Sequence, residues 1–290
     1  MSGSHYKPPA LPVVSDLLTL TVPEALRMLF EYYPEEMYPL FFASGRAAFQ
    51  SVFAKKRAVG GQAGFIAVLH TWTLRMLLHP HLHLLVPAAG LAASGCQLLY
   101  PRNEDFLVPV KALGKALKSA FQSQLREQYP ELFSKVDTTV WSQDWVAHCK
   151  PVGRGRTALR YLAAYVKKTA FSEERLLGST PDGQIRLRWK DGQDGQWKEE
   201  HLQPLELIRR WLLHVLPKGL MRIRHYGWLS PAANKAFLRI RYLLGMGAYK
   251  APRKLNSEPL RSQCCGEILM RIGRFEALRG PPLSRKPFTA

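Results

Sequence analysis

The chain has 290 residues, of which 47% are hydrophobic and 22% are charged; this suffices for a large folded domain and excludes a disordered or fibrous protein. Its 41 Lys and Arg residues against 22 Asp and Glu give a net charge of +19 at pH 7. So much positive charge repels itself unless a polyanion neutralises it. The charge balance therefore indicates nucleic acid as the first partner to consider and an anionic membrane surface as the second.

The sequence predicts neither a membrane segment nor secretion. Its least charged run, 84–100, is interrupted by Pro87, Gly90, Gly95 and Gln97, which a transmembrane helix would not tolerate together. The N-terminus lacks a compact apolar segment, and four cysteines in a chain of this length form no disulfide framework. No amphipathic anchor helix favours a membrane surface either. We expect a cytoplasmic protein with no membrane partner.

Hydrophobic periodicity predicts strands and helices that mingle along the chain. After a loose arm over 1–15, a strand is expected over 17–22, followed by a helical pattern to residue 59 with breaks at Pro34 and Pro39. Further strands are expected over 64–69, 81–86, 96–100 paired with 106–110, 145–150, and a hairpin of 183–189 with 196–200; further helices over 111–128, 157–169 and 204–215. Because βαβ spacing is absent, the pattern predicts an α+β fold with an antiparallel sheet.

Three histidines, at positions 79, 81 and 83, lie within five residues. Residues two apart on a strand point to one face, so His81 and His83 would project together while Leu82 enters the core. Two imidazoles suit one metal ion, but a third ligand must come from a neighbouring element, and His70 is the best candidate. Ordinary surface or core histidines are the alternative, which this density disfavours.

Two tyrosines, Tyr161 and Tyr165, lie four residues apart in the predicted helix and would share one face. Arg160, Lys167 and Lys168 surround them with positive charge. A tyrosine has a pKa near 10, so it needs cations or a metal to act as a nucleophile. Taken alone, such a pair more often only packs; beside a histidine strand and this net charge, chemistry is favoured.

A basic run follows: residues 207–257 contain eleven Lys or Arg and no Asp or Glu. A solvated helix face usually mixes charges of both signs, so this run favours a surface that faces phosphates. The competing interpretation is a core-packing helix whose charges only face water. The residues expected to bind phosphates are Arg160, Lys167, Lys168, Arg209, Arg210, Lys218, Arg222 and Arg224.

Three ordered motifs make the sequence similar to the two-tyrosine, rolling-circle HUH transposases of the insertion-sequence-ninety-one type, and by extension to HUH endonucleases of plasmid replication and conjugation. Residues 18–21 resemble the first strand motif of that family, and 69–72 with 79–83 resemble its histidine–hydrophobic–histidine block, the most specific of the three. Tyr161 and Tyr165 fall where its two-tyrosine motif is expected. The resemblance covers 16–245 and includes blocks at 211–219 and 222–227.

The resemblance implies an HUH endonuclease-like antiparallel sheet flanked by helices, with the histidines on a central strand and the tyrosine helix packed against it. It implies a nuclease core over 16–178, a basic hairpin and helical DNA-binding part over 179–257, and a basic tail over 258–290. It also implies a bacterial, nucleoid-associated protein whose partner is DNA, single-stranded at the transposon end and at the target.

The chemistry implied by the resemblance uses both residue clusters. His81, His83 and His70 would hold Mg²⁺ or Mn²⁺, although imidazoles alone would suit Zn²⁺ or Mn²⁺. Tyr161 or Tyr165 would attack a DNA phosphate and leave a 5′-phosphotyrosine and a free 3′-hydroxyl.

Two features depart from the family pattern. Members usually carry a cysteine-rich zinc-binding region before the first strand motif, where this sequence has residues 1–15. Residues 262–266 resemble a CxxCG knuckle whose first cysteine is Ser262, and the adjacent Cys264 and Cys265 would chelate one zinc ion poorly. The alternative function is therefore a truncated, non-catalytic DNA-binding remnant of such a transposase.

Overall fold

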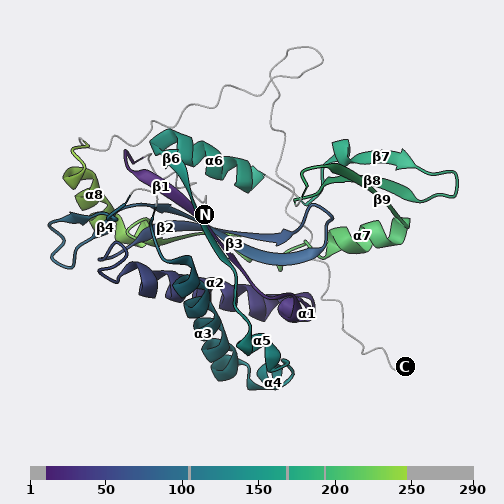
Figure 1. The fold of residues 1–290 in the computed structure, drawn as a ribbon, viewed down its shortest axis with the longest axis horizontal. Coiled ribbons are helices and arrows are strands. Elements are labelled where there is room, and N and C mark those ends of the chain that lie inside the picture. Colours follow the sequence, from purple (N-terminus) through teal and green to yellow (C-terminus); the bar gives the residue numbers. More distant parts are fainter. Residues whose placement is uncertain (1–10, 104–105, 168–169, 193, 247–290) are drawn as a thin grey trace, which may run out of the picture. The chain divides into compact units, whose positions relative to one another are not determined.

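A five-stranded antiparallel sheet with the strand order β10-β2-β3-β1-β6 forms the centre of the structure (Figure 1). The structure is a computed structural model, described here for residues 11–246 except 104–105, 168–169 and 193. These residues belong to the unit Met1–Gly247. The expected basic tail over 258–290 and the pair Cys264 and Cys265 lie outside the described residues.

The strands and helices interleave along the chain, and the predicted α+β class is confirmed. The strands are β1 (Val14–Thr21), β2 (Gly64–Trp72), β3 (Leu78–Pro87), β4 (Gly90–Leu91), β5 (Leu98–Leu99), β6 (Ala147–Arg154), β7 (Leu176–Ser179), β8 (Ile185–Lys190), β9 (Trp197–Leu202) and β10 (Ile223–Gly227). The helices are η1 (Glu24–Leu26), α1 (Arg27–Tyr32), α2 (Pro34–Phe53), α3 (Val110–Gln128), α4 (Pro130–Ser134), α5 (Thr139–Ser142), α6 (Gly155–Lys167), η2 (Glu173–Arg175), α7 (Pro204–Leu212), η3 (Pro231–Ala233) and α8 (Asn234–Leu243). Within the described residues, no helix combines the length and the apolar character needed to cross a membrane.

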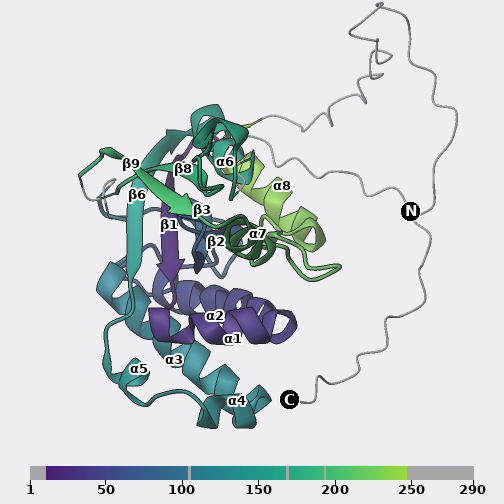
Figure 2. The same cartoon turned by 90° about the vertical axis from the view of Figure 1, so that its right-hand side faces the viewer.

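One face of the central sheet packs on α2 and α3, which lie below it in Figures 1 and 2. Leu20 of β1 pairs with Leu82 of β3, and both side chains are buried in this core. Gly45 lets α2 approach this point closely, since a Cβ there would lie 2.8 Å from Cδ1 of Leu82. Leu82 is thus anchored below the sheet, and its neighbours in sequence point to the other face.

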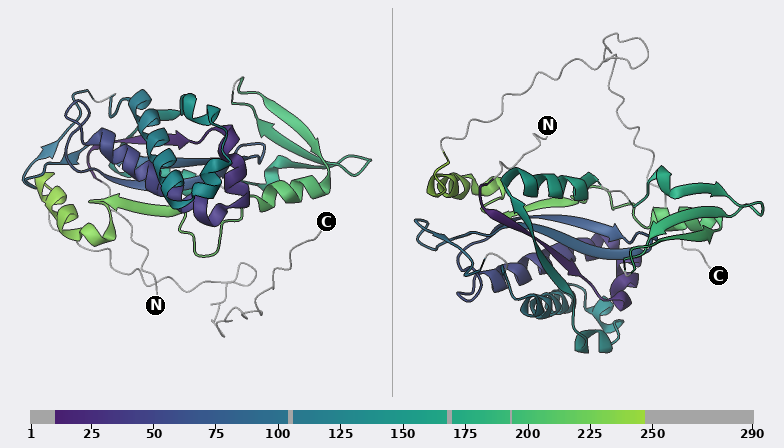
Figure 3. Two further views of the ribbon diagram at one scale, coloured as in Figure 1. Left: turned by 90° about the horizontal axis from the view of Figure 1, so that it is seen from below. Right: turned by 45° about the horizontal axis from the view of Figure 1, so that its top comes forward.

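The opposite face packs on α6, which lies above the sheet in Figure 1 and in the right-hand view of Figure 3. Ala158 and Leu162 of α6 are buried with Ile66 and Leu85 of the sheet. The tyrosine helix therefore covers the face to which the odd-numbered side chains of β3, including His81 and His83, belong.

A smaller sheet, β7-β8-β9, packs with α7 against Met76 in the turn between β2 and β3. The expected hairpin is confirmed, as β8 and β9 pair antiparallel. Arg75 of the turn forms an ion pair with Glu200 of β9 at 3.0 Å. His214, which follows α7, receives a hydrogen bond from Thr71 of β2 (3.1 Å) and donates one to the Met76 carbonyl (3.0 Å). The small sheet begins before residue 179, with β7, and the described part of 179–257 supplies β8, β9 and also β10, a strand of the central sheet.

Three local predictions were wrong. Pro39 does not break α2, because it lies near the helix N-terminus, loses one backbone hydrogen bond, and is flanked by buried apolar side chains. Residues 96–100 pair not with 106–110 but with the preceding β4, through a tight turn in which Gly95 has a φ of 68°. Residues 14–15, expected in a loose arm, begin β1.

Candidate active site

Three histidines from two adjacent strands face one another. His70 of β2 pairs in register with His81 of β3, and His83 lies two residues further along β3. One ligand nitrogen from each ring lies within 4.8 Å of the other two. Among the described residues, this is the one group of three His, Cys, Asp or Glu side chains arranged to share a metal ion. Metal–nitrogen bonds of roughly 2.0–2.1 Å place donors up to about 4 Å apart, so small ring rotations suffice.

Hydrogen bonds occupy the Nδ1 atoms of two of these rings. His81 Nδ1 donates to the His79 carbonyl oxygen at 2.7 Å, and His83 Nδ1 shares a 3.1 Å hydrogen bond with Thr19 Oγ1. Burial lowers the pKa of His81, which favours the neutral ring. A neutral His81 with its proton on Nδ1 offers the Nε2 lone pair to a cation, which is how outer hydrogen bonds usually orient metal-binding histidines.

His79, the third histidine of the sequence cluster, has a different environment. Its Nδ1 accepts a hydrogen bond from Arg27 at 2.9 Å. Burial, the neighbouring His81 and the positive charge of Arg27 lower the pKa of His79 to about 4. The structure therefore groups His70, not His79, with His81 and His83.

Tyr161 lies in the middle of α6, half-buried between the helix and strand β6. The Lys150 Nζ atom lies 5.1 Å from the centroid of its ring, within the range of cation–π attraction. Tyr165 follows one helical turn later; its side chain, that of Lys167, and all of Lys168 lie outside the described part of the chain. Arg160 is exposed.

A pocket of about 270 Å³ lies on strands β1 and β6. It is lined by Leu17, Thr19, His148, Cys149 and Lys150. Thr19 bonds the ring of His83, and Lys150 lies over the ring of Tyr161. Two of the lining residues, Thr19 and Lys150, thus contact one residue each of the histidine cluster and of the tyrosine helix.

Comparisons with known proteins bear on this site. The family model Y2_Tnp, described as "Putative transposase", matches residues 64–236. The chain belongs to this transposase family. The "Putative transposase y4qJ" of Sinorhizobium fredii (strain NBRC 101917 / NGR234) is 30% identical over 298 residues, 91% of this chain and 74% of that protein. The "Transposase for insertion sequence element IS801" of Pseudomonas savastanoi pv. phaseolicola is 29% identical over 288 residues, 90% of this chain and 68% of that protein. No solved structure matches the chain.

Membership of a transposase family implies that the protein acts on DNA, so the expected phosphate-binding residues can be placed. Arg222 is half-buried, lies over the ring of Trp72 at 5.5 Å, and donates to the Val166 carbonyl at the end of α6. Lys218 and Arg224 line an open groove of about 670 Å³ beside the start of α2. Arg222, Lys218 and Arg224 therefore remain candidates for DNA contacts.

Two other arginines of the transposase have carboxylate partners. Arg209 is exposed and pairs with Glu206 at 2.7 Å. Arg210 was expected to bind phosphate, and this expectation does not fit the structure. Its side chain is buried, with Glu206 at 2.7 Å and Glu200 at 3.0 Å. Its charge is neutralised inside the protein, and its role is to attach α7 to β9.

Trp72, His148 and Lys150 were not identified as site residues from the sequence. Trp72 stacks on His70, with ring centroids 4.7 Å apart. His148 and Lys150 are two residues apart on the strand expected over 145–150. This spacing alone could have predicted that both side chains share one face of the sheet.

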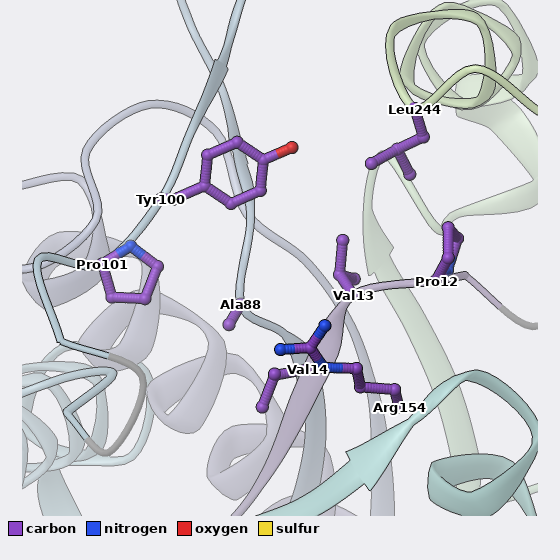
Figure 4. Close-up of a pocket in the computed structure, with 8 residues that line it drawn as sticks. All are labelled: Pro12, Val13, Val14, Ala88, Tyr100, Pro101, Arg154 and Leu244. Carbon is purple, nitrogen blue, oxygen red and sulfur yellow. The ribbon is translucent and has the colours of Figure 1, made fainter.

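A second pocket lies at the start of β1, where Val14 is five residues from Thr19, the residue bonded to His83 (Figure 4). It has a volume of about 370 Å³ and includes Val14, Tyr100 and Arg154 among its lining residues. At roughly 3.3 Å per strand residue, Val14 and Thr19 are about 16 Å apart. This pocket is therefore separate from the histidines of the transposase.

Proposed function

We propose that this transposase is an HUH-type enzyme that nicks single-stranded DNA and transfers the strand through a tyrosine-linked intermediate in rolling-circle transposition. The observation that carries the proposal is that one pocket is lined by a residue in contact with the histidine cluster and by a residue in contact with Tyr161. Thr19, which bonds His83, and Lys150, which lies over Tyr161, both line it. A phosphate in this pocket would lie beside Thr19 and Lys150, the residues that contact His83 and Tyr161.

His70, His81 and His83 would hold the divalent cation. Their arrangement fits one, because the three rings converge and two have Nδ1 engaged in outer hydrogen bonds. The family resemblance favours Mg²⁺ or Mn²⁺, while the nitrogen-only donor set would also suit Zn²⁺. When bound, the cation supplies Lewis-acid polarisation to an oxygen of the phosphate.

Tyr161 or Tyr165 supplies the nucleophile. The phenol loses its proton, its oxygen forms a bond to phosphorus, and the bond from phosphorus to the 3′ oxygen breaks. The 3′ oxygen takes up a proton, which leaves a free 3′-hydroxyl and a 5′-phosphotyrosine. Because the new link keeps the energy of the phosphodiester bond, transfer to a second 3′-hydroxyl requires no ATP. Two tyrosines on one helix would allow two covalent links in one cycle.

The experiment that tests this proposal uses the purified chain and a labelled pool of single-stranded oligonucleotides with Mn²⁺. We expect a covalent adduct on a denaturing gel, prevented by a chelator, which mass spectrometry maps to Tyr161 or Tyr165. The alternative, a DNA-binding remnant, keeps the basic surface without the chemistry. A chain that retains the pool on a native gel but forms no adduct would show the remnant to be correct.

A further inference from the structure

We infer that Lys150 is a catalytic residue of this site, with His148 beside it. Its ammonium group stabilises the phenolate of Tyr161 and, together with His148, binds the phosphate that this tyrosine receives. The inference rests on the proposed function and extends it to strand β6, which carries none of the expected site residues.

The first support is the register of β6 against β1. His148 pairs with Thr19 and Lys150 pairs with Leu17. Paired residues of adjacent strands point to the same face of the sheet, and Thr19 points to the face of His83, to which it is bonded. His148 and Lys150 are therefore exposed side chains at the edge of the sheet, on the same face as the histidines of β2 and β3.

The residue between them is not a competing nucleophile. Cys149 points to the other face, where its thiol lies 3.8 Å from the Asp16 carboxylate. Burial and the negative charge of Asp16 raise the pKa of this thiol to about 12. The thiol stays protonated and unreactive at neutral pH.

The second support is the contact between Lys150 and Tyr161. A cation beside a phenol favours the phenolate over the neutral form. The cations expected near the tyrosines from the sequence were on the helix itself. Arg160 is exposed and, as the residue next to Tyr161 in a helix, points about 100° away from it. Among the described side chains, Lys150 provides the charge, from the facing strand.

The third support is the chemistry of the pocket. Lys150 carries three donors and no acceptor, and an imidazole can donate one further hydrogen bond. With the hydroxyl of Thr19, these groups line a space of about 270 Å³. Donors in such a position stabilise the charge that develops on the phosphate oxygens as the tyrosine attacks. After the attack, the same groups are placed to hold the phosphotyrosine.

The first experiment needs neither DNA nor metal. Ring-labelled tyrosine is incorporated, the NMR signal lost in Tyr161→Phe is assigned to Tyr161, and its titration midpoint is compared between variants. We expect Lys150→Met to raise the midpoint by about one pH unit, since a nearby opposite charge shifts an acid by roughly 1–3 units. Lys150→Arg should restore the wild-type midpoint. Lys111→Met, which removes an exposed lysine from α3 on the other side of the sheet, should leave it unchanged.

The second experiment measures adduct formation against pH. The titratable side chains on this face of the pocket are Lys150 and His148 of β6, with Tyr161 of α6 beside Lys150 and His83 of β3 bonded to Thr19; the Cys149 thiol points to the other face. At pH 7, Lys150→Met should slow the reaction on the order of 100-fold, the loss typical of one such donor, and a higher pH should recover part of it. His148→Gln, which keeps a donor, should be less affected than His148→Ala.

The outcomes distinguish the two proposals. If the wild type forms no adduct, the proposed function is wrong, whatever the titration shows. If the wild type forms an adduct and Lys150→Met matches it in rate, pH profile and Tyr161 midpoint, the role of Lys150 is wrong and the proposed function stands.

Discussion

Trp72 stacks on His70, with the ring centroids 4.7 Å apart and the ring planes inclined by 16°. The same indole lies beneath the guanidinium of Arg222, which donates a hydrogen bond to the Val166 carbonyl at the end of α6. Trp72 thus lies between a proposed metal ligand and the helix that carries the tyrosines. It is well placed to hold the ring of His70 in the orientation that brings it towards His81 and His83.

We therefore expect Trp72→Leu to weaken Mn²⁺ binding by roughly 10- to 100-fold, as loss of a group that orients a metal ligand usually does. Trp72→Phe keeps an aromatic surface against His70 and should lose less. Titration calorimetry on the protein without DNA measures the affinity. Trp211→Leu, at an exposed tryptophan of α7, is the matched control. Wild-type affinity in Trp72→Leu would show that the stacking does not orient the ligand.

The histidines themselves give the second prediction. His81→Ala and His83→Ala should abolish Mn²⁺ binding and adduct formation while single-stranded DNA still binds, because the basic surface is untouched. His70→Ala should be equally severe. His201→Ala, an exposed histidine of β9, should behave like the wild type. If His81→Ala or His83→Ala nicks DNA at the wild-type rate with added Mn²⁺, these histidines do not hold the catalytic metal ion.

His79→Ala separates the fourth histidine from the other three. The variant keeps the backbone carbonyl that accepts from His81 and loses only the ring bonded to Arg27. We expect a mild loss of Mn²⁺ affinity. A severe loss here, with a mild one in His70→Ala, would make His79 the third ligand.

The placement of the histidines was largely predictable from the sequence. Period-two alternation put His81 and His83 on one face with Leu82 in the core, and an antiparallel neighbour was the natural source of His70. Whether they hold a metal stays a prediction. Lys150 and His148 could not be assigned in the same way, because their place in the pocket depends on the register between β6 and β1, which no periodicity within one strand contains.

The helix α7 shows where periodicity misleads. Its apolar residues share one face, as expected, yet Leu205 is 80% exposed and Leu212 57% exposed. The buried residue is Arg210, which is fixed by Glu206 on its own helix and Glu200 of β9. Hydrophobic spacing cannot predict this, because the burial of Arg210 depends on ion pairs with two carboxylates, one of which comes from another strand.

The third prediction follows from this arrangement. Arg210→Met should lower the free energy of unfolding by about 2 kcal/mol, somewhat less than the 3–5 kcal/mol of a fully buried broken pair, because Glu200 and Glu206 are partly exposed. Arg209→Met removes the neighbouring, exposed arginine and should cost less than about 1 kcal/mol. Urea unfolding followed by circular dichroism measures both. Equal losses in the two variants would mean that Arg210 is no more important than a surface arginine.

The fourth prediction concerns pH. Hydrogen bonds from Arg209 and Arg210 lower the pKa of Glu206 to about 2, below its unfolded value near 4.5. The folded state therefore binds this proton less readily, so the stabilisation is complete above pH 4.5 and is lost as the pH falls towards 2. The stability difference between the wild type and Glu206→Gln should shrink over this interval in thermal unfolding. A difference that stays constant from pH 7 to pH 3 would contradict the assignment.

The last prediction concerns the tyrosines, because covalent attachment of DNA to them would distinguish an active enzyme from a non-catalytic DNA-binding remnant. Tyr161 and Tyr165 are one turn apart on α6, so a small shift of the DNA strand could bring a phosphate to either. A Tyr→Phe change removes one oxygen and little packing, so the fold should persist. We expect each single variant to keep part of the adduct formed with labelled single-stranded DNA and Mg²⁺, and the double variant to form none.

Tyr242→Phe controls for the loss of a phenol elsewhere, since Tyr242 is 76% exposed on α8, and it should form as much adduct as the wild type. If the tyrosines only pack against the sheet, all these variants should match the wild type. If the double variant still forms an adduct, the two-tyrosine mechanism is wrong, because another residue must then carry the phosphate. If Tyr161→Phe alone abolished the adduct, the nucleophile would be the tyrosine that Lys150 faces, and Tyr165 would be left without a covalent role.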